Sequence, residues 1–171
     1  LGYASYILKH PQYQDLRDHP ESDWAFNPLD PQTYELQFDL YRQAMEATPH
    51  GKYLHVGGDE VHTTGRESGQ SALELNLIWL NKVSEFAAEN GRIPIFWDDM
   101  PLKQAELYYP MFDPNLPKEK VDSLWMANKG NLEQFLDRFP KNCIYMRWNY
   151  SHAETYGNDK AMQWFTGNGL K

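Results

Sequence analysis

The chain has 171 residues, with 24 acidic and 16 basic side chains and a formal net charge of −8 at pH 7. This balance argues against a nucleic-acid backbone or an anionic membrane surface as the partner, because both attract clustered Lys and Arg side chains. The hydrophobic content of 41%, taken together with the 11 glycines, lies in the usual range of a globular domain and argues against disorder. Aromatic residues make up 15% of the chain, so we expect some of these rings to face a ligand and not the core.

The single cysteine, Cys143, excludes an internal disulfide and a cysteine-based zinc site. We expect it to be a small buried apolar residue and not a reactive thiol. No apolar run approaches the roughly 18–20 residues that a membrane-spanning helix needs. The first residues, Leu1-Gly2-Tyr3-Ala4, include neither an initiator Met nor a signal-peptide pattern, so we interpret the chain as a piece of a longer protein.

In the first half of the chain, two amphipathic helices flank a short apolar strand. The first helix is predicted to begin at Pro31, a favoured first helical residue, and to end before Pro49. A buried strand is predicted over residues 53–56. The second helix begins with the capping box at Ser71 and ends at Gly91, a common helix-terminating residue.

The second half of the chain continues this alternation. In chain order, the pattern predicts a strand over residues 93–97, a helix over 102–109 and a proline-rich loop over 110–120. It then predicts a strand over 121–126, a helix over 132–139, a strand over 143–148 and a helix over 159–165.

The predicted strands are separated by helices and lie too far apart for hairpins, which indicates right-handed βαβ units and a parallel sheet. Each strand ends in residues able to bind or react, namely Asp59-Glu60, Trp97-Asp98-Asp99, Trp125 and Trp148-Asn149-Tyr150. In a (β/α) barrel, the carboxyl ends of the strands form the active face. We therefore predict an α/β fold of the (β/α)8 TIM-barrel type. Residues 1–171 would form one partial-barrel domain of about four βα units, since a full barrel has eight strands and about 250 residues.

The most informative segment is His55-Val56-Gly57-Gly58-Asp59-Glu60-Val61, an apolar strand that runs into two glycines and two acids. It resembles the active-site motif of glycoside hydrolase family 20, the β-N-acetylhexosaminidases. Three further segments occur in the order that this family shows, namely Lys9-His10-Pro11, Asn27-Pro28-Leu29-Asp30-Pro31 and Phe96-Trp97-Asp98-Asp99. The resemblance therefore covers most of the chain, from the end of the family's third strand to its seventh.

The resemblance implies a retaining hydrolase that removes terminal β-linked N-acetylhexosamine from a glycan or glycoconjugate, without a cofactor or a metal. Glu60 would be the general acid and base. Asp59 would orient the 2-acetamido group, whose own oxygen attacks the anomeric carbon to give an oxazolinium intermediate. A carboxyl pair suits this chemistry, because one carboxyl must donate a proton and burial beside a second carboxylate raises the pKa of a carboxyl group.

The same resemblance assigns candidate substrate-binding residues. Trp97 and Trp125 would line the acetamido pocket, and Trp148 would add a further aromatic face for the sugar. Tyr150 would hydrogen-bond the acetamido oxygen, with Tyr145 as the competing assignment. Burial in the core remains the alternative for each tryptophan. We expect Asp99 to hydrogen-bond either a sugar hydroxyl or a neighbouring residue of the site.

Three alternative interpretations stay open at this point. Gly57-Gly58-Asp59-Glu60 can also be a polar turn that caps the following helix. Asp98-Asp99 is a second candidate for the acidic pair, since other acetamido-sugar hydrolases use adjacent aspartates, but it lacks a preceding glycine turn. His55 and His62 beside the acidic pair could form a metal site, although their spacing matches no zinc-binding helix motif.

The chain departs from the family at its start, where Gly2-Tyr3-Ala4 replaces a Gly-His-Ala type sequence whose His supports the acid carboxyl. Tyrosine can hydrogen-bond a carboxyl, but it cannot carry positive charge or shuttle a proton at neutral pH. The alternative functions are therefore a catalytically silent sugar-binding homologue and a purely structural barrel fragment.

The family's remaining sugar-gripping residues, on its first and last strands, lie outside this chain. We therefore expect the isolated segment to be inactive and to associate through its open sheet edges. We expect no membrane segment. The localisation of the parent protein stays open among the secreted, periplasmic and lysosomal compartments, and the choice between glucosamine and galactosamine derivatives stays open too.

Overall fold

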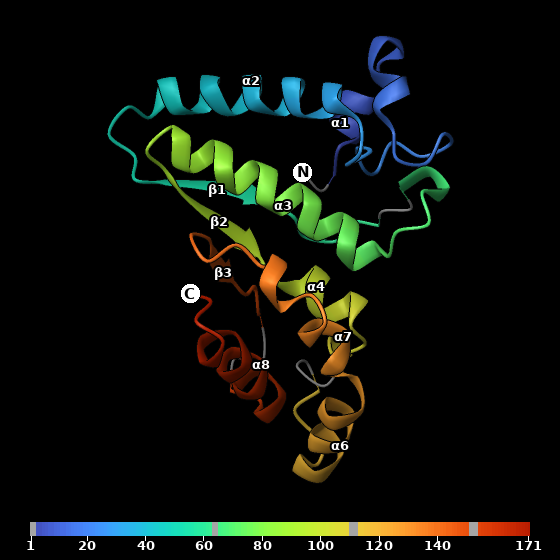
Figure 1. Ribbon diagram of the computed structural model, residues 1–171, viewed down its shortest axis with the longest axis vertical. Helices are drawn as coiled ribbons and strands as arrows, with labels where there is room; N and C mark the ends of the chain where they lie inside the picture. The colour runs from blue at the N-terminus through green and yellow to red at the C-terminus, as the bar shows by residue number, and fades with distance from the viewer. Residues whose placement is uncertain (1–2, 63–64, 110–112, 151–153) are drawn as a thin grey trace.

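The structure is a computed structural model that describes residues 3–62, 65–109, 113–150 and 154–171 (Figure 1). Its elements in chain order are α1 (Ser5–Leu8), η1 (Pro11–Leu16), α2 (Pro31–Ala47), β1 (Tyr53–Gly57), η2 (Gly65–Glu67), α3 (Ala72–Glu89), β2 (Ile93–Trp97), α4 (Asp99–Gln104), α6 (Lys118–Asn128), α7 (Gly130–Glu133), η3 (Leu136–Arg138), β3 (Ile144–Met146) and α8 (Tyr156–Gly167).

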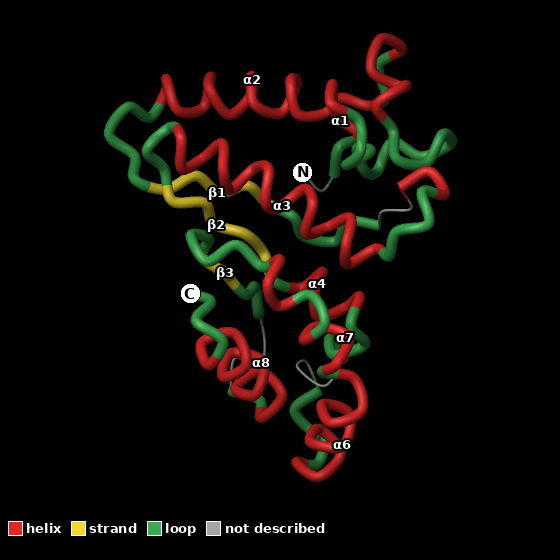
Figure 2. The backbone as a smooth tube through the Cα atoms, in the orientation of Figure 1, coloured by secondary structure: helices red, strands yellow, loops and turns green. Residues whose placement is uncertain are grey.

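The strands of the described residues form one parallel sheet in the order β1-β2-β3, which is also their order in the chain (Figure 2). Each strand is thus added to the same edge of the growing sheet. Tyr53 pairs with Ile93, and Ile95 pairs with Ile144. The register shifts between His55 and Gly57, at the end of β1 that carries the acidic motif. The predicted parallel sheet and the mixed helix-and-strand class are confirmed.

The two long helices begin at the predicted caps. The Asp30 carboxylate accepts the backbone N–H of Gln32 at 2.9 Å, and the Ser71 hydroxyl accepts that of Glu74 at 3.1 Å. Each cap satisfies a backbone donor that has no partner within its helix and contributes about 1 kcal/mol. The predictions of both helices are confirmed.

The main core lies where these helices pack on one face of the sheet, and it extends to buried side chains of α6, α7 and α8. Leu54, Val56 and Phe96 are buried there against side chains of α2 and α3, and Figure 1 shows α3 crossing the strands with α2 beyond it. Complete burial of a ring such as Phe96 contributes about 1.5–3 kcal/mol. Alternate residues point to the opposite face, where Tyr53 and Ile93 remain 55% and 43% exposed. The helices therefore cover only one face of this sheet.

The prediction of a strand over residues 121–126 is wrong, because this segment lies within helix α6. Val121 and Trp125 are its buried residues, while Met126 is 71% exposed. Burial at positions i and i+4 is the helical period, and six residues are too few to distinguish this period from that of a strand. The described residues thus contain three strands where the sequence predicted four.

Several predicted boundaries also differ from the structure. The helix expected over 102–109 is α4, which ends at Gln104 because Glu106 adopts a left-handed φ of 61° and the Leu107 N–H returns to the Leu102 carbonyl at 2.8 Å. The helix expected over 132–139 is divided into α7 and η3, and the strand expected over 143–148 is confined to Ile144–Met146. The predicted loop is shorter, since α6 begins at Lys118; its residues 110–112 lie outside the described residues.

The C-terminal residues lie beside β3. The Tyr145 N–H donates to the Lys171 carbonyl at 2.7 Å, and Leu170 is buried. Cys143, just before β3, is free and buried, as expected from the sequence.

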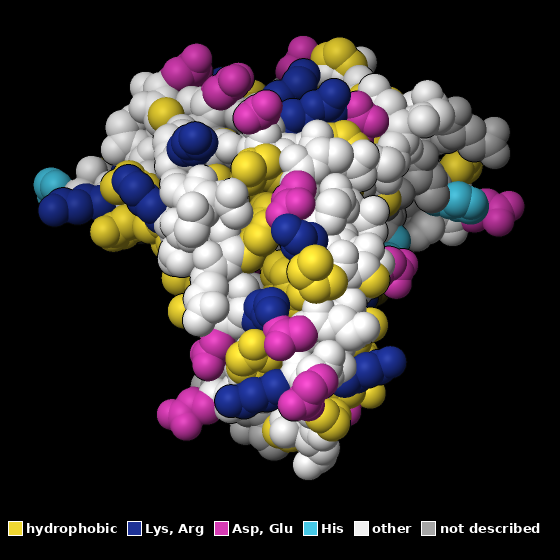
Figure 3. All heavy atoms as spheres, turned by 60° about the horizontal axis from the view of Figure 1, so that its bottom comes forward, with side chains coloured by type: hydrophobic (Ala, Val, Ile, Leu, Met, Phe, Trp, Pro, Cys, Tyr) yellow, Lys and Arg dark blue, Asp and Glu magenta, His cyan; other side chains and the backbone are white. Residues whose placement is uncertain are grey.

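At the α6 and α8 end of the molecule, acidic and basic side chains lie intermixed with apolar ones (Figure 3). Within the described ranges, no helix has both the length and the apolarity needed to cross a membrane.

Candidate active site

The acidic motif follows β1 on a backbone that only glycine allows. Gly58 has a φ of 98°, and a Cβ atom placed on it would lie 2.1 Å from a ring carbon of Phe96 and 3.2 Å from Trp79. Both the dihedral angle and the available space therefore exclude larger residues. The backbone of Gly58 packs on the core side chains Phe96 and Trp79, and the turn places Asp59 and Glu60 at the carboxyl end of β1.

Glu60 itself is in the left-handed region, with a φ of 49°, which costs a non-glycine residue about 1–2 kcal/mol. Neighbouring side chains hold it on several sides. The Trp24 indole N–H donates to the Glu60 carbonyl at 2.8 Å, and the Glu60 N–H donates to Asp99 Oδ2 at 3.1 Å. The Tyr3 hydroxyl donates to Glu60 Oε2, and the Tyr3 ring packs on Trp24 at a centroid distance of 4.8 Å. The fold thus fixes both the backbone and the carboxyl group of Glu60.

A cleft of about 260 Å³ opens above this turn. The residues that line it are Tyr3, Asp59, Glu60, Trp97, Trp148 and Tyr150. The structure therefore brings together five of the seven site residues proposed from the sequence, and it adds Tyr3. Aromatic rings and two carboxyl groups form the walls. Such a cleft can hold a polar ring-shaped ligand between apolar faces while presenting a proton donor to it.

Trp125 is not brought to the cleft. It lies on α6, is 2% exposed and belongs to the hydrophobic core. Its assignment to the acetamido pocket depended on a strand end that is absent, so the alternative of core burial is the one that the structure supports.

The two tyrosine candidates have different surroundings. Tyr145 donates its hydroxyl to the Pro140 carbonyl at 2.9 Å and stacks on Phe165 at 5.1 Å, within the core. Tyr150 lines the cleft beside Trp148, with ring centroids 5.7 Å apart, and is 89% exposed. The following residues, Ser151 and His152, lie outside the described residues.

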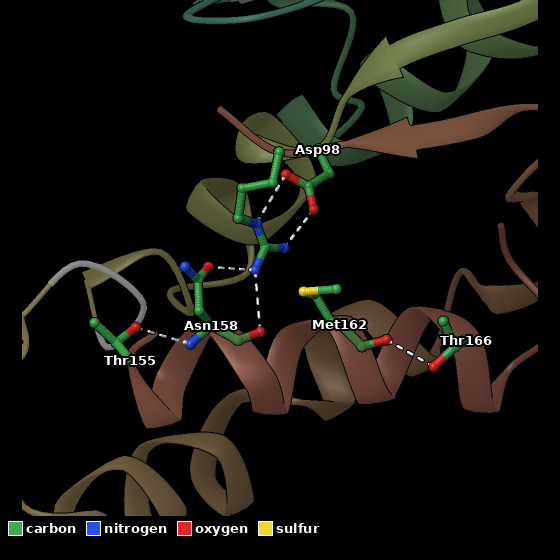
Figure 4. Close-up of polar contacts among 6 residues, drawn as sticks. Asp98, Thr155, Asn158, Met162 and Thr166 are labelled. Carbon is green, nitrogen blue, oxygen red and sulfur yellow. Dashed lines mark hydrogen bonds and ion pairs between the residues drawn. The ribbon is translucent and has the colours of Figure 1, made fainter. Parts of the chain in front are cut away.

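Asp98 and Asp99 have separate partners. Arg147 binds the Asp98 carboxylate through two nitrogens, and its remaining nitrogen donates to the Asn158 side chain at 2.7 Å and to the Asn158 carbonyl at 3.2 Å (Figure 4). Burial raises the pKa of Asp98, and the Arg147 guanidinium opposes that rise. Asp98 therefore links β2, the end of β3 and α8, and it does not line the cleft.

Asp99 is the first residue of α4, is 2% exposed and lies beneath Glu60. Burial raises its pKa to about 6, although the hydrogen bond from the Glu60 N–H lowers it in part. Asp99 therefore contacts the acidic motif through the backbone N–H of Glu60. Neither Asp98 nor Asp99 is among the residues that line the cleft.

Two tyrosines near the site retain their protons over a wide pH range. The hydrogen bond to Glu60, followed by desolvation, raises the pKa of Tyr3 to about 12. Burial, followed by the negative charges of Asp99 and Glu60, raises the pKa of Tyr108 to about 12. Both hydroxyls are thus neutral hydrogen-bonding groups at physiological pH.

Sequence reasoning missed Trp24, Tyr108 and Arg147. Trp24 and Arg147 lie far in sequence from their partners Glu60 and Asp98, and no local pattern indicates such contacts. Tyr108 was placed inside a predicted helix that ends earlier in the structure. Among the described residues, no group of three or more His, Cys, Asp or Glu side chains is arranged to hold a metal ion.

A parallel α/β domain that carries a carboxyl pair and aromatic rings at the carboxyl end of its strands is suited to binding and cleaving sugars. Residues 3–159 match the family described as glycosyl hydrolase family 20, catalytic domain, and the chain belongs to that family.

Two similar proteins carry the name hexosaminidase D. The one from Bos taurus is 27% identical over 111 residues, which cover 58% of this chain and 32% of that protein. The one from Homo sapiens is 26% identical over 111 residues, which cover 58% of this chain and 23% of that protein. The chain thus spans a third or less of the length of these curated relatives.

Proposed function

We propose that this chain carries the acid and orienting residues of a retaining glycosidase that removes terminal β-linked N-acetylhexosamine by substrate-assisted catalysis. The observation that carries the proposal is the placement of Asp59 and Glu60 together in a cleft walled by Trp97 and Trp148, in a chain of family 20. The hexosaminidase names of the two relatives agree with this substrate class.

In the proposed reaction, Glu60 donates a proton to the glycosidic oxygen as the bond to the anomeric carbon breaks. The acetamido oxygen of the substrate attacks that carbon from the opposite face, while Asp59 accepts the acetamido N–H and stabilises the positive charge. Glu60 then removes a proton from water, which opens the oxazolinium ring with net retention. Tryptophan faces in the cleft would stack on the sugar.

We further propose that residues 1–171 are part of a single (β/α)8 barrel, of which this chain supplies the βα units around β1, β2 and β3. Strands added in chain order to one edge and catalytic residues at the strand ends are features of that fold. The exposed sheet face, with Tyr53 and Ile93, suits the interior of a barrel that other strands complete. The isolated chain should therefore be inactive and should self-associate, which sedimentation velocity would test; a monodisperse monomer would count against this proposal.

A catalytically silent sugar-binding homologue is the second candidate, and one contact favours it. Tyr3 occupies the place beside Glu60 where the family commonly has His, and its hydroxyl cannot exchange protons near neutral pH. Such a homologue would bind the acetamido sugar without hydrolysing it, and Tyr3→His would be the substitution expected to introduce turnover.

The deciding experiment is hydrolysis of p-nitrophenyl N-acetyl-β-glucosaminide, and of its galactosaminide counterpart, by the full-length protein. It is run with and without a thiazoline mimic of the oxazolinium intermediate. We expect turnover that the thiazoline blocks and that Glu60→Gln reduces by a factor of about 100 or more. The matched control is Glu89→Gln, at the exposed end of α3. Thiazoline binding without turnover would favour the silent homologue, and equal rates for Glu60→Gln and the wild type would overturn the catalytic proposal.

A further inference from the structure

The carboxyl group of the proposed acid is only as well placed as the backbone that carries it. Glu60 adopts a left-handed φ of 49°, which a side chain with a Cβ atom rarely adopts without support. Trp24 and Tyr3 bind its carbonyl and carboxylate oxygens. The backbone N–H of Glu60 is bound by Asp99, from a different strand end.

Asp99 is built into the fold more firmly than a surface carboxylate would be. It is 2% exposed, it begins helix α4 with one residue between it and the end of β2, and its Oδ2 accepts the Glu60 N–H at 3.1 Å. Its Oδ1 is buried without a hydrogen-bond partner among the described residues. A buried carboxyl with one oxygen unpartnered is costly, and its main compensation here is the bond to Glu60.

We propose that Asp99 is a positioning residue for the hydrolysis: it holds the backbone of Glu60 in the left-handed conformation that presents the acid to the cleft, and it does not touch the sugar. This inference rests on the proposed function, since Glu60 is the proton donor there. A displacement of about 1 Å at a catalytic group can cost about 100-fold in rate, so the support of one N–H is of consequence.

The ionisable groups around Asp99 come from several elements. Asp59 and Glu60 face it from the turn after β1, Asp98 adjoins it, and Tyr108 and Arg147 lie on the segments after α4 and β3. Burial raises the pKa of Asp99 to about 6. Protonation of Asp99 below that pH would weaken its acceptance of the Glu60 N–H, so the acid limb of the rate profile should contain an inflection that belongs to Asp99.

The experiment compares Asp99→Ala, Asp99→Asn and the wild type in the full-length protein. An asparagine oxygen can still accept the Glu60 N–H, whereas alanine cannot. Two readouts are followed, namely kcat and KM on the aryl glycoside and deuterium uptake by the peptide that contains Glu60. The control is Asp98→Asn, which is similarly buried but bonded to Arg147.

We expect Asp99→Ala to lower kcat about 100-fold with little change in KM, and to raise deuterium uptake at the Glu60 peptide alone. Asp99→Asn should retain most of kcat and of the protection, and it should lose the inflection near pH 6, which tests the inference even where Asp99→Ala fails to fold. Wild-type kcat and uptake in Asp99→Ala would overturn the inference, as would an equal fall in kcat for Asp98→Asn. If the wild type itself does not turn over, the proposed function fails, and the exchange comparison still decides whether Asp99 holds Glu60.

Discussion

The Tyr3 hydroxyl donates a hydrogen bond to the Glu60 carboxylate, across 57 positions of sequence. It joins the first described residue of the chain to the turn after β1, and the packing of Tyr3 on Trp24 reinforces it. The N-terminal segment is therefore part of the candidate site.

Removing this hydroxyl tests its contribution to activity. Tyr3→Phe keeps the ring on Trp24 but deletes a hydrogen bond to a charged group, so we expect kcat/KM of the full-length protein to fall about 10-fold. Because the pKa of Tyr3 is raised to about 12, the hydroxyl keeps its proton over the assay range, and the deficit should not arise from titration of Tyr3. Tyr6→Phe, at a residue that is 79% exposed, is the control. A Tyr3→Phe variant with unchanged kcat/KM would contradict the expectation.

Alanine at Gly58 should be far more damaging than alanine at another glycine with positive φ. At Gly69, with a φ of 80°, a Cβ atom would have no described atom within 4 Å, so Gly69→Ala should cost about 1–2 kcal/mol for its dihedral angle alone. Gly58→Ala adds a clash with Phe96 and should cost about 1–3 kcal/mol more. Thermal unfolding of both variants measures the difference, and equal losses would show that Phe96 yields without cost.

Replacing only one member of the buried Asp98–Arg147 ion pair should lower the free energy of unfolding substantially. Arg147→Met leaves the Asp98 carboxylate buried without its cation, for which we expect a loss of about 3–5 kcal/mol at pH 7. The double variant Asp98→Asn/Arg147→Met removes both charges and should lose less. Denaturant unfolding of the two single variants and the double variant completes the cycle. Additive losses would mean that the pair is not coupled.

The raised pKa of Asp99 predicts the sign of a pH dependence in stability. The folded protein binds the Asp99 proton more tightly than the unfolded chain, so this contribution is complete below the unfolded pKa of 3.8 and is lost as the pH rises through about 6. The rise from 3.8 to about 6 is worth up to about 3 kcal/mol. As the pH rises from about 4 to about 6, the interval between the unfolded and folded pKa of Asp99, the unfolding temperature of the wild type should therefore fall relative to that of Asp99→Asn. A constant difference between them would contradict the assignment.

Local signals carried most of the successful sequence predictions. The caps at Asp30 and Ser71, the alternating strands and the two glycines before Asp59 all act within a few residues, which a single sequence displays directly. Spatial grouping of Asp59, Glu60, Trp97 and Trp148 followed from one further rule, that parallel strands direct their carboxyl ends to one edge.

The failures have physical causes of their own. Trp125 lies in a segment, residues 121–126, whose apolar positions are too few to distinguish a strand from a buried helix face. Adjacent Asp98 and Asp99 look alike in sequence, yet Arg147 binds the first and the Glu60 N–H binds the second. Such differences depend on tertiary contacts between distant segments, which neither spacing nor composition reports.

The contact of Gly58 with Phe96 places a residue of the candidate site on the ring that fills the core beneath β1 and α3. A change in the size of the residue at position 96 would move the backbone of Gly58, and with it Asp59 and Glu60, even though residue 96 does not line the cleft. The packing of the interior and the position of the proposed catalytic residues therefore depend on the same ring. Evolutionary substitution of Phe96 should therefore be restricted both by core packing and by the position of the acidic motif. Where Phe96 is replaced, we expect a compensating change at Trp79, the other side chain that packs against Gly58.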